Sequence, residues 1–260
     1  MYSKEHQIYL KKLKKERFII LFFRIFIIIS FILLWEILAR RNIINTFLLS
    51  SPSNILKTTI SLFKSNDLLS HIFTTTYEVI ISFLISSIIS LIIATIFWSN
   101  KIVEKILDPY LTIINSLPKV SLGPLIIILF GANTKSIIFM AILIIVFTST
   151  ISMYNTFINT DSSKITLLKS FGANKIQIFT KLILPSNITS MINILKINIS
   201  LSLIGVIMGE LLVSKKGLGY LITYGSQVFN LNLVITSIFI LAILSYLLYF
   251  LIDKKEKNQK

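Results

Sequence analysis

Long apolar runs separated by short polar segments are the feature that most constrains the fold of this chain. Of its 260 residues, 54% are hydrophobic and only 14% are charged, whereas a soluble domain is far more polar. Several runs approach or exceed the roughly 20 apolar residues that an α-helix needs to cross the hydrocarbon core of a bilayer. We therefore predict an all-α, polytopic membrane protein.

Six membrane spans are expected, at about residues 18–38, 77–98, 107–130, 136–157, 191–213 and 233–252. Together they make a transmembrane domain over residues 18–252, between a basic arm at 1–17 and a charged tail at 253–260. The first run and its basic flank are similar to a signal peptide. However, the run is long and lacks a clear small-x-small cleavage site, so we expect an uncleaved span.

The positive charges predict which side of the membrane each loop faces. The net charge is +15, and the lysines lie beside the spans and in short loops, as in the positive-inside rule, which argues against nucleic acid as the partner. Segments 1–17, 99–107, 158–190 and 253–260 hold 16 Lys and Arg residues, against 7 in segments 39–75, 131–135 and 214–232. Both termini are therefore expected in the cytoplasm, although Arg40 and Arg41 weakly oppose this orientation.

The third span contains the helix-breaking residues Pro118, Gly123 and Pro124. They predict a kinked or discontinuous helix, which a membrane tolerates only where neighbouring protein supports the freed backbone groups. All eight glycines lie at or after Gly123. Irregular backbone, and with it specified packing and motion, is therefore expected in the second half of the chain.

Residues 161–185 are the longest polar interruption between Ile102 and Lys254. Their apolar residues recur at helical spacing in two runs, and Gly172 lies between the runs, at the C′ position of the first helix. Asn174 with Gln177 predicts a capping box for the second helix, which Pro185 closes. We predict a basic, amphipathic helix–glycine–helix element in the cytoplasm.

Two interpretations of this element compete. A basic amphipathic segment between spans can lie on anionic lipid, or it can dock a cytosolic partner. The glycine break, the cap and the proline stop specify a shaped helix pair, which contact with lipid does not require. Docking is therefore the favoured interpretation.

Sequence motifs of enzymes are absent. There is no phosphate-binding Gly-x-x-x-x-Gly-Lys-Ser/Thr loop, no helical pair of histidines for zinc and no nucleophile elbow. The only histidines are His6 and His71, and there is no cysteine. We expect neither catalysis nor a metal or cofactor in this chain, so any nucleotide that powers it must bind another subunit.

Three acids lie within or at the edge of the expected spans, and each is a functional candidate because an ionisable group in a membrane is costly. Glu36 and Glu78 lie near span ends, which favours snorkelling to the interface. Glu210 is deeper, where lining of a path and ordinary inter-helix contact are equally supported. Gly205 and Gly209 form a small-xxx-small pattern, which suits packing within the chain or a dimer seam.

These residues together resemble the permeases of binding-protein-dependent ABC importers. Gly172 followed after nine residues by 182–185 (Leu-Ile-Leu-Pro) is similar to the family's cytoplasmic EAA loop, with Thr-Leu-Leu at 166–168 in place of Glu-Ala-Ala. Segments 107–131, 209–222 and 50–53 are similar to the nitrate, sulfonate and taurine subfamily. The resemblance runs in order from about residue 33 to 253.

The resemblance implies a MetI-like permease core, an ABC ATPase dimer on the cytoplasmic side that binds the ATP, an external solute-binding protein, and a homodimer of this chain in a bacterial inner membrane. The residues that it implies for ATPase coupling are Ile165, Leu168, Lys169, Phe171, Gly172, Ala173, Asn174, Lys175, Ile176, Leu184 and Pro185. Those expected in the path and its packing are Pro118, Gly123, Pro124, Gly205, Gly209 and Glu210.

Two other functions stay open at this point. An ion-coupled secondary transporter needs intramembrane acids and an internal repeat; Glu210 is one such acid, but no convincing repeat relates the two halves. A membrane anchor needs no broken spans. For an importer, the subfamily suggests sulfonate, taurine, nitrate or a thiamine-precursor-like solute.

Overall fold

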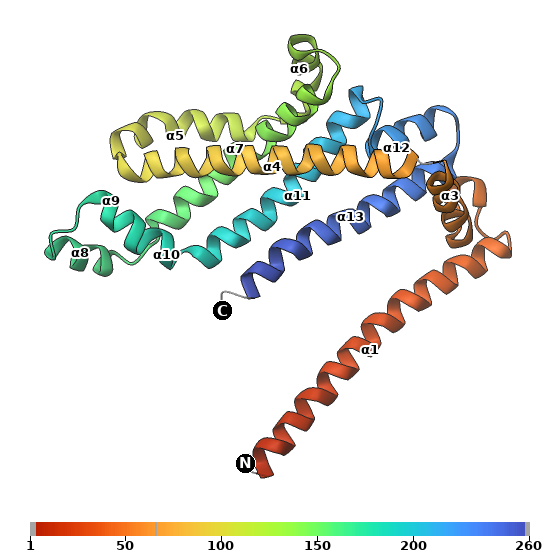
Figure 1. Ribbon diagram of the computed structural model, residues 1–260, viewed down its shortest axis with the longest axis horizontal. Coiled ribbons are helices and arrows are strands. Elements are labelled where there is room, and N and C mark those ends of the chain that lie inside the picture. Colours follow the sequence, from red (N-terminus) through yellow and green to blue (C-terminus); the bar gives the residue numbers. More distant parts are fainter. Residues whose placement is uncertain (1–3, 66, 258–260) are drawn as a thin grey trace.

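A computed structural model describes residues 4–65 and 67–257, and every regular element within them is helical (Figure 1). Among these residues five helices are long and apolar enough to cross a membrane: α1 (Lys4–Arg40), α4 (Asp67–Ser99), α7 (Thr134–Ile158), α11 (Ile188–Val213) and α13 (Leu231–Lys257). A sixth candidate is the bent pair α5 (Lys101–Ser116) and α6 (Gly123–Phe130), joined by the 3-10 turn η1 (Lys119–Leu122). The prediction of an all-α, polytopic fold is confirmed.

Each expected span except the third lies within one helix, and these helices are longer than the apolar runs. The helix α1 takes in most of the expected N-terminal arm, and α4 begins at Asp67, ten residues before the expected span. The ends of the arm and tail, residues 1–3 and 258–260, lie outside the described residues. The short helices are α2 (Thr46–Leu49), α3 (Pro52–Lys64), α8 (Ser162–Ser170), α9 (Lys175–Ile178), the π-helical η2 (Phe179–Ile183), α10 (Leu184–Ser186) and α12 (Leu218–Gln227).

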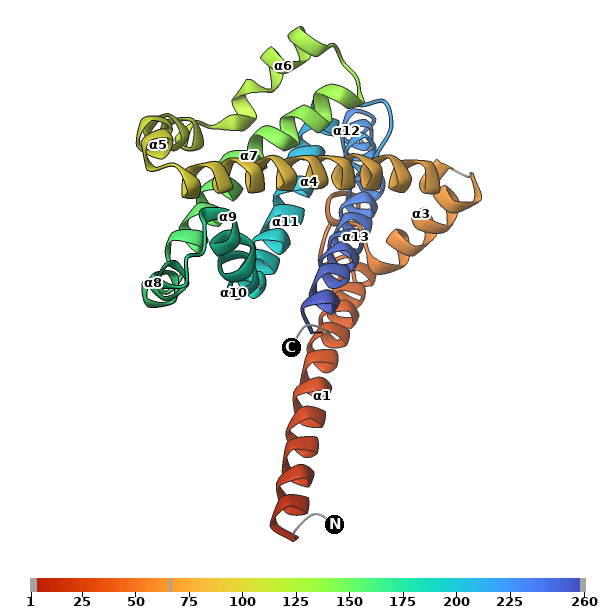
Figure 2. The ribbon, with the colours of Figure 1, turned by 60° about the vertical axis from the view of Figure 1, so that its left-hand side comes forward.

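Helix α7 lies at the centre of the bundle and packs along both α4 and α11 (Figures 1 and 2). Close approach is possible because the facing residues are small. A Cβ added to Gly205 would lie 2.6 Å from the Cα of Ala141, and one added to Gly209 would lie 2.9 Å from Cγ2 of Ile137. Within this chain, then, the small-xxx-small pattern packs α11 against α7.

Polar side chains cross-link the same three helices at the level of the membrane. The Ser82 and Ser202 hydroxyls are 2.6 Å apart, and the Asn198 amide donates to Ser87 at 3.1 Å and Ser149 at 2.9 Å. Such bonds are worth about 0.6 kcal/mol each on average in membrane bundles. Their main effect is to fix the register of α4, α7 and α11.

The third span is broken where the sequence predicts it. The two halves meet at 85°, because Leu117 before Pro118 is extended and the proline has no N–H to continue the helix. Pro124 lies in the first turn of α6, where its missing N–H costs nothing. A Cβ at Gly123 would lie 2.8 Å from Leu212, so α6 begins in close contact with α11.

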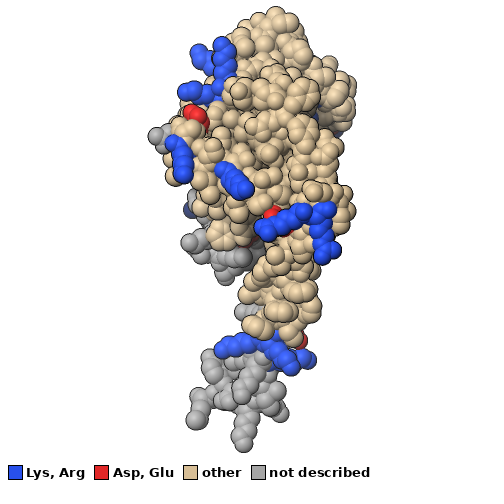
Figure 3. All heavy atoms as spheres, turned by 90° about the vertical axis from the view of Figure 1, so that its right-hand side faces the viewer, with Lys and Arg blue, Asp and Glu red and all other residues tan. Residues whose placement is uncertain are grey.

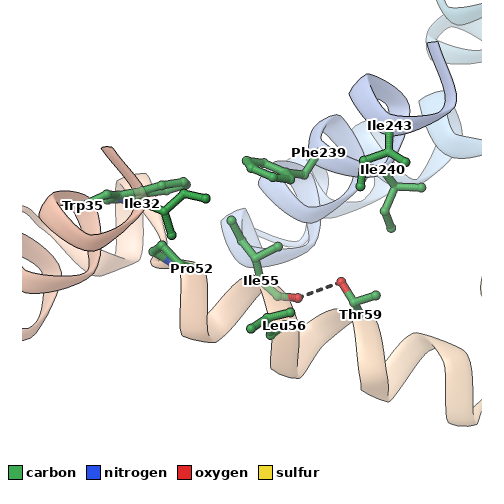
Figure 4. Close-up of a pocket in the computed structure, with 9 residues that line it drawn as sticks. All are labelled: Ile32, Trp35, Pro52, Ile55, Leu56, Thr59, Phe239, Ile240 and Ile243. Atoms are coloured by element: carbon green, nitrogen blue, oxygen red, sulfur yellow. Dashed lines mark hydrogen bonds between the residues drawn. The ribbon is translucent and has the colours of Figure 1, made fainter. Parts of the chain in front are cut away.

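Helix α1 projects away from the bundle and contacts it mainly through α3 (Figures 1 and 2). Ser51 caps α3 by accepting from the Asn54 N–H at 3.2 Å. A mainly apolar pocket of about 310 Å³ lies between α1, α3 and α13, with Trp35 facing Phe239 (Figure 4). Most of the coloured surface in Figure 3 carries no charge, which suits a lipid environment.

The contact between α7 and α11 gives the first prediction. Replacing Gly205 by valine places its side chain on the backbone of Ala141, so we expect the free energy of unfolding to fall by about 1–3 kcal/mol through overpacking. Thermal unfolding of the purified chain in detergent measures this. Ile204→Val changes a neighbouring exposed side chain and should have little effect; equal unfolding temperatures for both variants would contradict the close contact.

Candidate functional site

The first half of the element at 161–185 is a helix with both ends fixed by the sequence. The Asp161 carboxylate caps α8 by accepting from the Ser163 N–H at 2.9 Å. Gly172 ends it in the left-handed conformation, at φ +78°. The N–H groups of Gly172 and Ala173 bond the carbonyls of Lys169 and Leu168 at 2.9 and 3.0 Å, which is the Schellman arrangement. The predicted helix end is confirmed.

The second half begins at the predicted capping box. The Asn174 N–H donates to Gln177 at 2.8 Å, and the Gln177 N–H donates back to Asn174 at 2.9 Å. The helical run then continues through α9, η2 and α10 to Ser186, one residue beyond the predicted stop at Pro185. The π-turn of η2 ends two residues before this proline, and such turns relieve the loss of a normal helical bond.

An aromatic and aliphatic cluster joins this element to the spans; we call it the joint. It contains the buried residues Ala94, Met153, Phe157, Ile178, Ile183 and Ile194. The Phe179 ring lies 5.4 Å from Phe157 and 5.2 Å from Trp98, measured between ring centroids. Lys175 adds a bond of 3.1 Å to the Ser99 carbonyl at the end of α4. The element is thus packed firmly against α4, α7 and α11.

The apolar residues expected to dock a partner divide into two groups. Ile165 and Leu168 pack inward against the joint, whereas Phe171 and Ile176 are 77% and 73% exposed. Leu167 is also exposed, although the sequence interpretation did not select it. It could have been selected because it lies within the Thr-Leu-Leu that replaces the Glu-Ala-Ala of the family's loop. We call Leu167, Phe171 and Ile176 the outer apolar face.

The remaining residues of the element have supporting positions. Ala173 packs against the joint beside Leu184, and Pro185 follows in the last turn. Lys169 and Lys175 line a groove of about 500 Å³ with Trp98 and Lys101 at the α4–α5 corner.

At the opposite end of α11, Glu210 holds the segment before α12 against α4. Its carboxylate accepts from the Thr75 hydroxyl at 2.7 Å and from the Gly219 N–H at 2.5 Å. Gly217 lies against the same carboxylate at φ +110°, with no room for a Cβ, and its N–H donates to His71 at 2.9 Å. Glu210 therefore has an anchoring role in this chain.

Glu78 differs from the expectation that it snorkels to the interface. Because α4 begins at Asp67, Glu78 lies three turns inside the helix, and it is completely buried. Among the described residues neither of its carboxyl oxygens has a hydrogen-bond partner, and Glu210 is its nearest titratable neighbour. Glu36 is also bonded rather than free, to Arg40 at 2.7 Å and to the Ser53 N–H at 3.1 Å.

The expected path residues fall into three places. Pro118, Gly123 and Pro124 form the break between α5 and α6, Gly205 and Gly209 pack α11 on α7, and Glu210 lies near the C-terminal end of α11. The structure adds Lys119, the first residue after Pro118, whose ammonium bonds Asn115. The proline-based interpretation passed over this lysine.

Comparison with known proteins identifies the family. Residues 86–255, more than half of the chain, match the family described as the inner membrane component of binding-protein-dependent transport systems. The chain belongs to this family. It is an ABC importer permease subunit, not itself an enzyme, and a multi-pass inner membrane protein. A binding-protein-dependent system implies an ATPase and a binding protein as partners.

Individual relatives agree with this assignment. A formylaminopyrimidine transport permease of Halalkalibacterium halodurans is 30% identical over 86% of this chain and 88% of its own length. A Bacillus subtilis permease named for aliphatic sulfonates is 25% identical over 83% and 78%. A solved inward-facing methionine ABC transporter, MetNI, has a chain that matches 74% of this one and 96% of its own length, with a TM-score of 0.67 at 19% identity. The last likeness supports the fold alone.

The buried carboxyl pair gives the second prediction. Glu210→Ala leaves the Thr75 hydroxyl and the Gly219 N–H unpaired, so we expect the free energy of unfolding to fall by about 1–3 kcal/mol. Glu78→Gln should keep or raise stability, because it replaces a buried carboxyl that has no hydrogen-bond partner among the described residues by an amide of the same shape that cannot ionise. Unfolding in detergent compares both with the exposed control Glu16→Ala. If Glu78→Gln unfolds at a lower temperature than Glu210→Ala, the prediction is wrong, because the Glu78 carboxyl then contributes more to stability than Glu210 does.

Proposed function

We propose that this permease forms the path for a small solute as a homodimer, and that α8–α10 receive the motion of the ATPase. The observation that carries the proposal is the outer apolar face, an exposed patch on an element otherwise packed firmly against three spans. Large exposed apolar side chains on a polar, capped helix pair are typical of a docking site.

The charges around this face suit a partner groove of mixed polarity. The outer apolar face is flanked by Lys164, Lys169, Lys175 and Lys181. Gly172 gives the bend between the two helices, and Asn174 fixes the start of the second. Lys169 and Lys175 then lie at the rim nearest α4, where they can meet acidic groups of the ATPase.

We infer the orientation of the chain from the position of the same element. In Figure 1 α8–α10 and both ends of the described chain lie toward one end of the bundle, with α3 and α12 at the other. This arrangement supports cytoplasmic termini on the ATPase side and an outer side formed by α3, α12 and the start of α7. The solute, delivered there by a binding protein, belongs to the sulfonate, taurine, nitrate or thiamine-precursor-like class.

If the ATPase docks on the outer apolar face, one negative charge placed there should weaken its binding. Phe171→Asp places a carboxylate on the most exposed side chain of the outer apolar face, so we expect binding of the ATPase to weaken by about 30-fold or more, as for an interface hot spot. The measurement is the amount of ATPase that co-purifies with the tagged permease expressed with its chromosomal neighbours. Phe229→Asp is the matched control, since Phe229 is 74% exposed beyond α12 at the other end. Equal recovery with both variants contradicts the proposal.

The orientation is tested separately. The sequence contains no cysteine, so Ser170→Cys and Ser226→Cys are single-cysteine chains without further change. In intact cells or spheroplasts a membrane-impermeant maleimide should label Ser226→Cys, whereas Ser170→Cys should react only after the membrane is opened. The reverse pattern would place α8–α10 outside.

A further inference from the structure

Lys119 is the only charged residue between Asp108 and Lys135, and it lies at the break of the third span. Charged residues inside membrane segments are costly, by about 2.5–3.5 kcal/mol for a lysine at the centre of an inserted helix. They persist where they are paired or face water. The surroundings of this ammonium group therefore indicate what Lys119 does.

The depth of Lys119 is fixed through Asn115. The Thr148 hydroxyl donates to Asn115 Oδ1 at 2.9 Å, and Thr148 is the fifteenth of the 25 residues of α7. Asn115 thus lies near the middle of a span. Lys119 Nζ in turn donates to Asn115 Oδ1 at 2.9 Å and to its backbone carbonyl at 3.0 Å. The ammonium group is held close to the membrane midplane.

Both partners of this ammonium group are neutral. Among the described residues the salt bridges are Glu36–Arg40 and Lys196–Asp253, and neither involves Lys119. An ammonium group has three N–H donors, and Asn115 occupies two of them. The side chain is only partly buried, and Ser116 and Ser121 on either side are exposed. A cation with a free donor at this depth cannot face lipid, so it faces an aqueous path.

The position of Lys119 at the break also points to an anion. The turn η1 begins at Lys119, directly after Pro118, so the ammonium group lies where the third span is discontinuous. Discontinuous helices near the midplane bind anionic groups of substrates in other transporters. An ammonium group with a free N–H donor and only neutral partners suits an oxyanion rather than a cation.

We propose that Lys119, positioned by Asn115 and Thr148, is a specificity-determining residue that binds an anionic group of the solute at the midpoint of the path. The group is a sulfonate or another oxyanion of similar size. This inference rests on the proposed transport function, but it concerns this chain alone and is tested on it alone.

The first test asks whether Lys119 faces water. Lys119→Cys in native membranes should react with sulfonatoethyl methanethiosulfonate, because thiols react as thiolates, which form in water and not in lipid. Ile29→Cys, on the exposed apolar surface of α1, is the lipid-facing control and should not react. A Lys119→Cys chain as unreactive as this control overturns the proposal, whether a lipid environment or an acidic residue of a second copy covers the site.

The second test asks whether Lys119 binds an anion. Ethanesulfonate should raise the unfolding temperature of the purified chain in nanodiscs, since a ligand that binds the folded state stabilises it. Its uncharged isostere ethyl methyl sulfone should not. Lys119→Gln should weaken the apparent affinity for ethanesulfonate about tenfold or more, whereas Lys119→Arg and the control Lys135→Gln should retain it.

The outcomes separate this inference from the proposed function. No shift with ethanesulfonate in the wild-type chain, or an equal shift in Lys119→Gln, overturns the anion site even if the ATPase co-purifies as proposed. Conversely, a Lys119-dependent shift supports the site even if Phe171→Asp leaves ATPase binding unchanged, in which case the docking proposal fails alone.

Discussion

The joint around Phe157 is the contact on which the rest of this structure depends. Phe157 is the largest fully buried side chain of the described residues, and it lies where α8–α10 would otherwise be attached only through their connecting residues. Removing a buried phenylalanine typically costs about 3–5 kcal/mol, so the packed state is strongly favoured. Because of this packing, a force applied to Phe171 or Ile176 is applied to α4, α7 and α11 as well.

The joint is tightly packed, whereas other parts of the bundle are less regular. The α4–α7–α11 core is held by small residues and by buried hydroxyl and amide contacts, whereas α1 contacts the core mainly through α3 and the third span is broken. Irregular backbone is tolerated in a membrane only beside supporting protein or a water-filled cavity. In this chain, α7 supports one side of the break and Lys119 marks the other side as aqueous.

Much of this fold could be predicted because the signals are local. Hydropathy gives the spans, Pro118 and Pro124 give the break, and Gly172 with Asn174 gives the two helices of the element at 161–185. Each depends on backbone chemistry within a few residues. Helical spacing also shows that Ile165, Leu168, Phe171 and Ile176 recur as in amphipathic helices, but it does not show which of them faces a partner. That choice depends on the joint, where Ile178 meets Ala94 of α4 and Ile194 of α11, which come from other parts of the chain.

The contacts of the buried acids could not be predicted from the sequence either, because they depend on helices that are distant in the chain. Glu78 has the sequence surroundings of a residue near a span end, and only the extension of α4 to Asp67 places it inside the bundle opposite Glu210. The loop glycines at 217 and 219 are similar to a family motif in sequence, but their contact with the Glu210 carboxylate is visible only in three dimensions.

The central claim is that α8–α10 move with α7 as one body. Since the chain has no native cysteine, spin labels at Ser170→Cys on α8 and Lys135→Cys on α7 report one distance within the chain when excess unlabelled chain is mixed in, so that only one copy of the dimer carries both labels. It should be measured in the complex with the ATPase, by double electron–electron resonance, without nucleotide and trapped with ATP and vanadate. The account predicts the same narrow distance distribution in both states. A shifted or broadened distribution on nucleotide binding would show that the element moves independently of the spans.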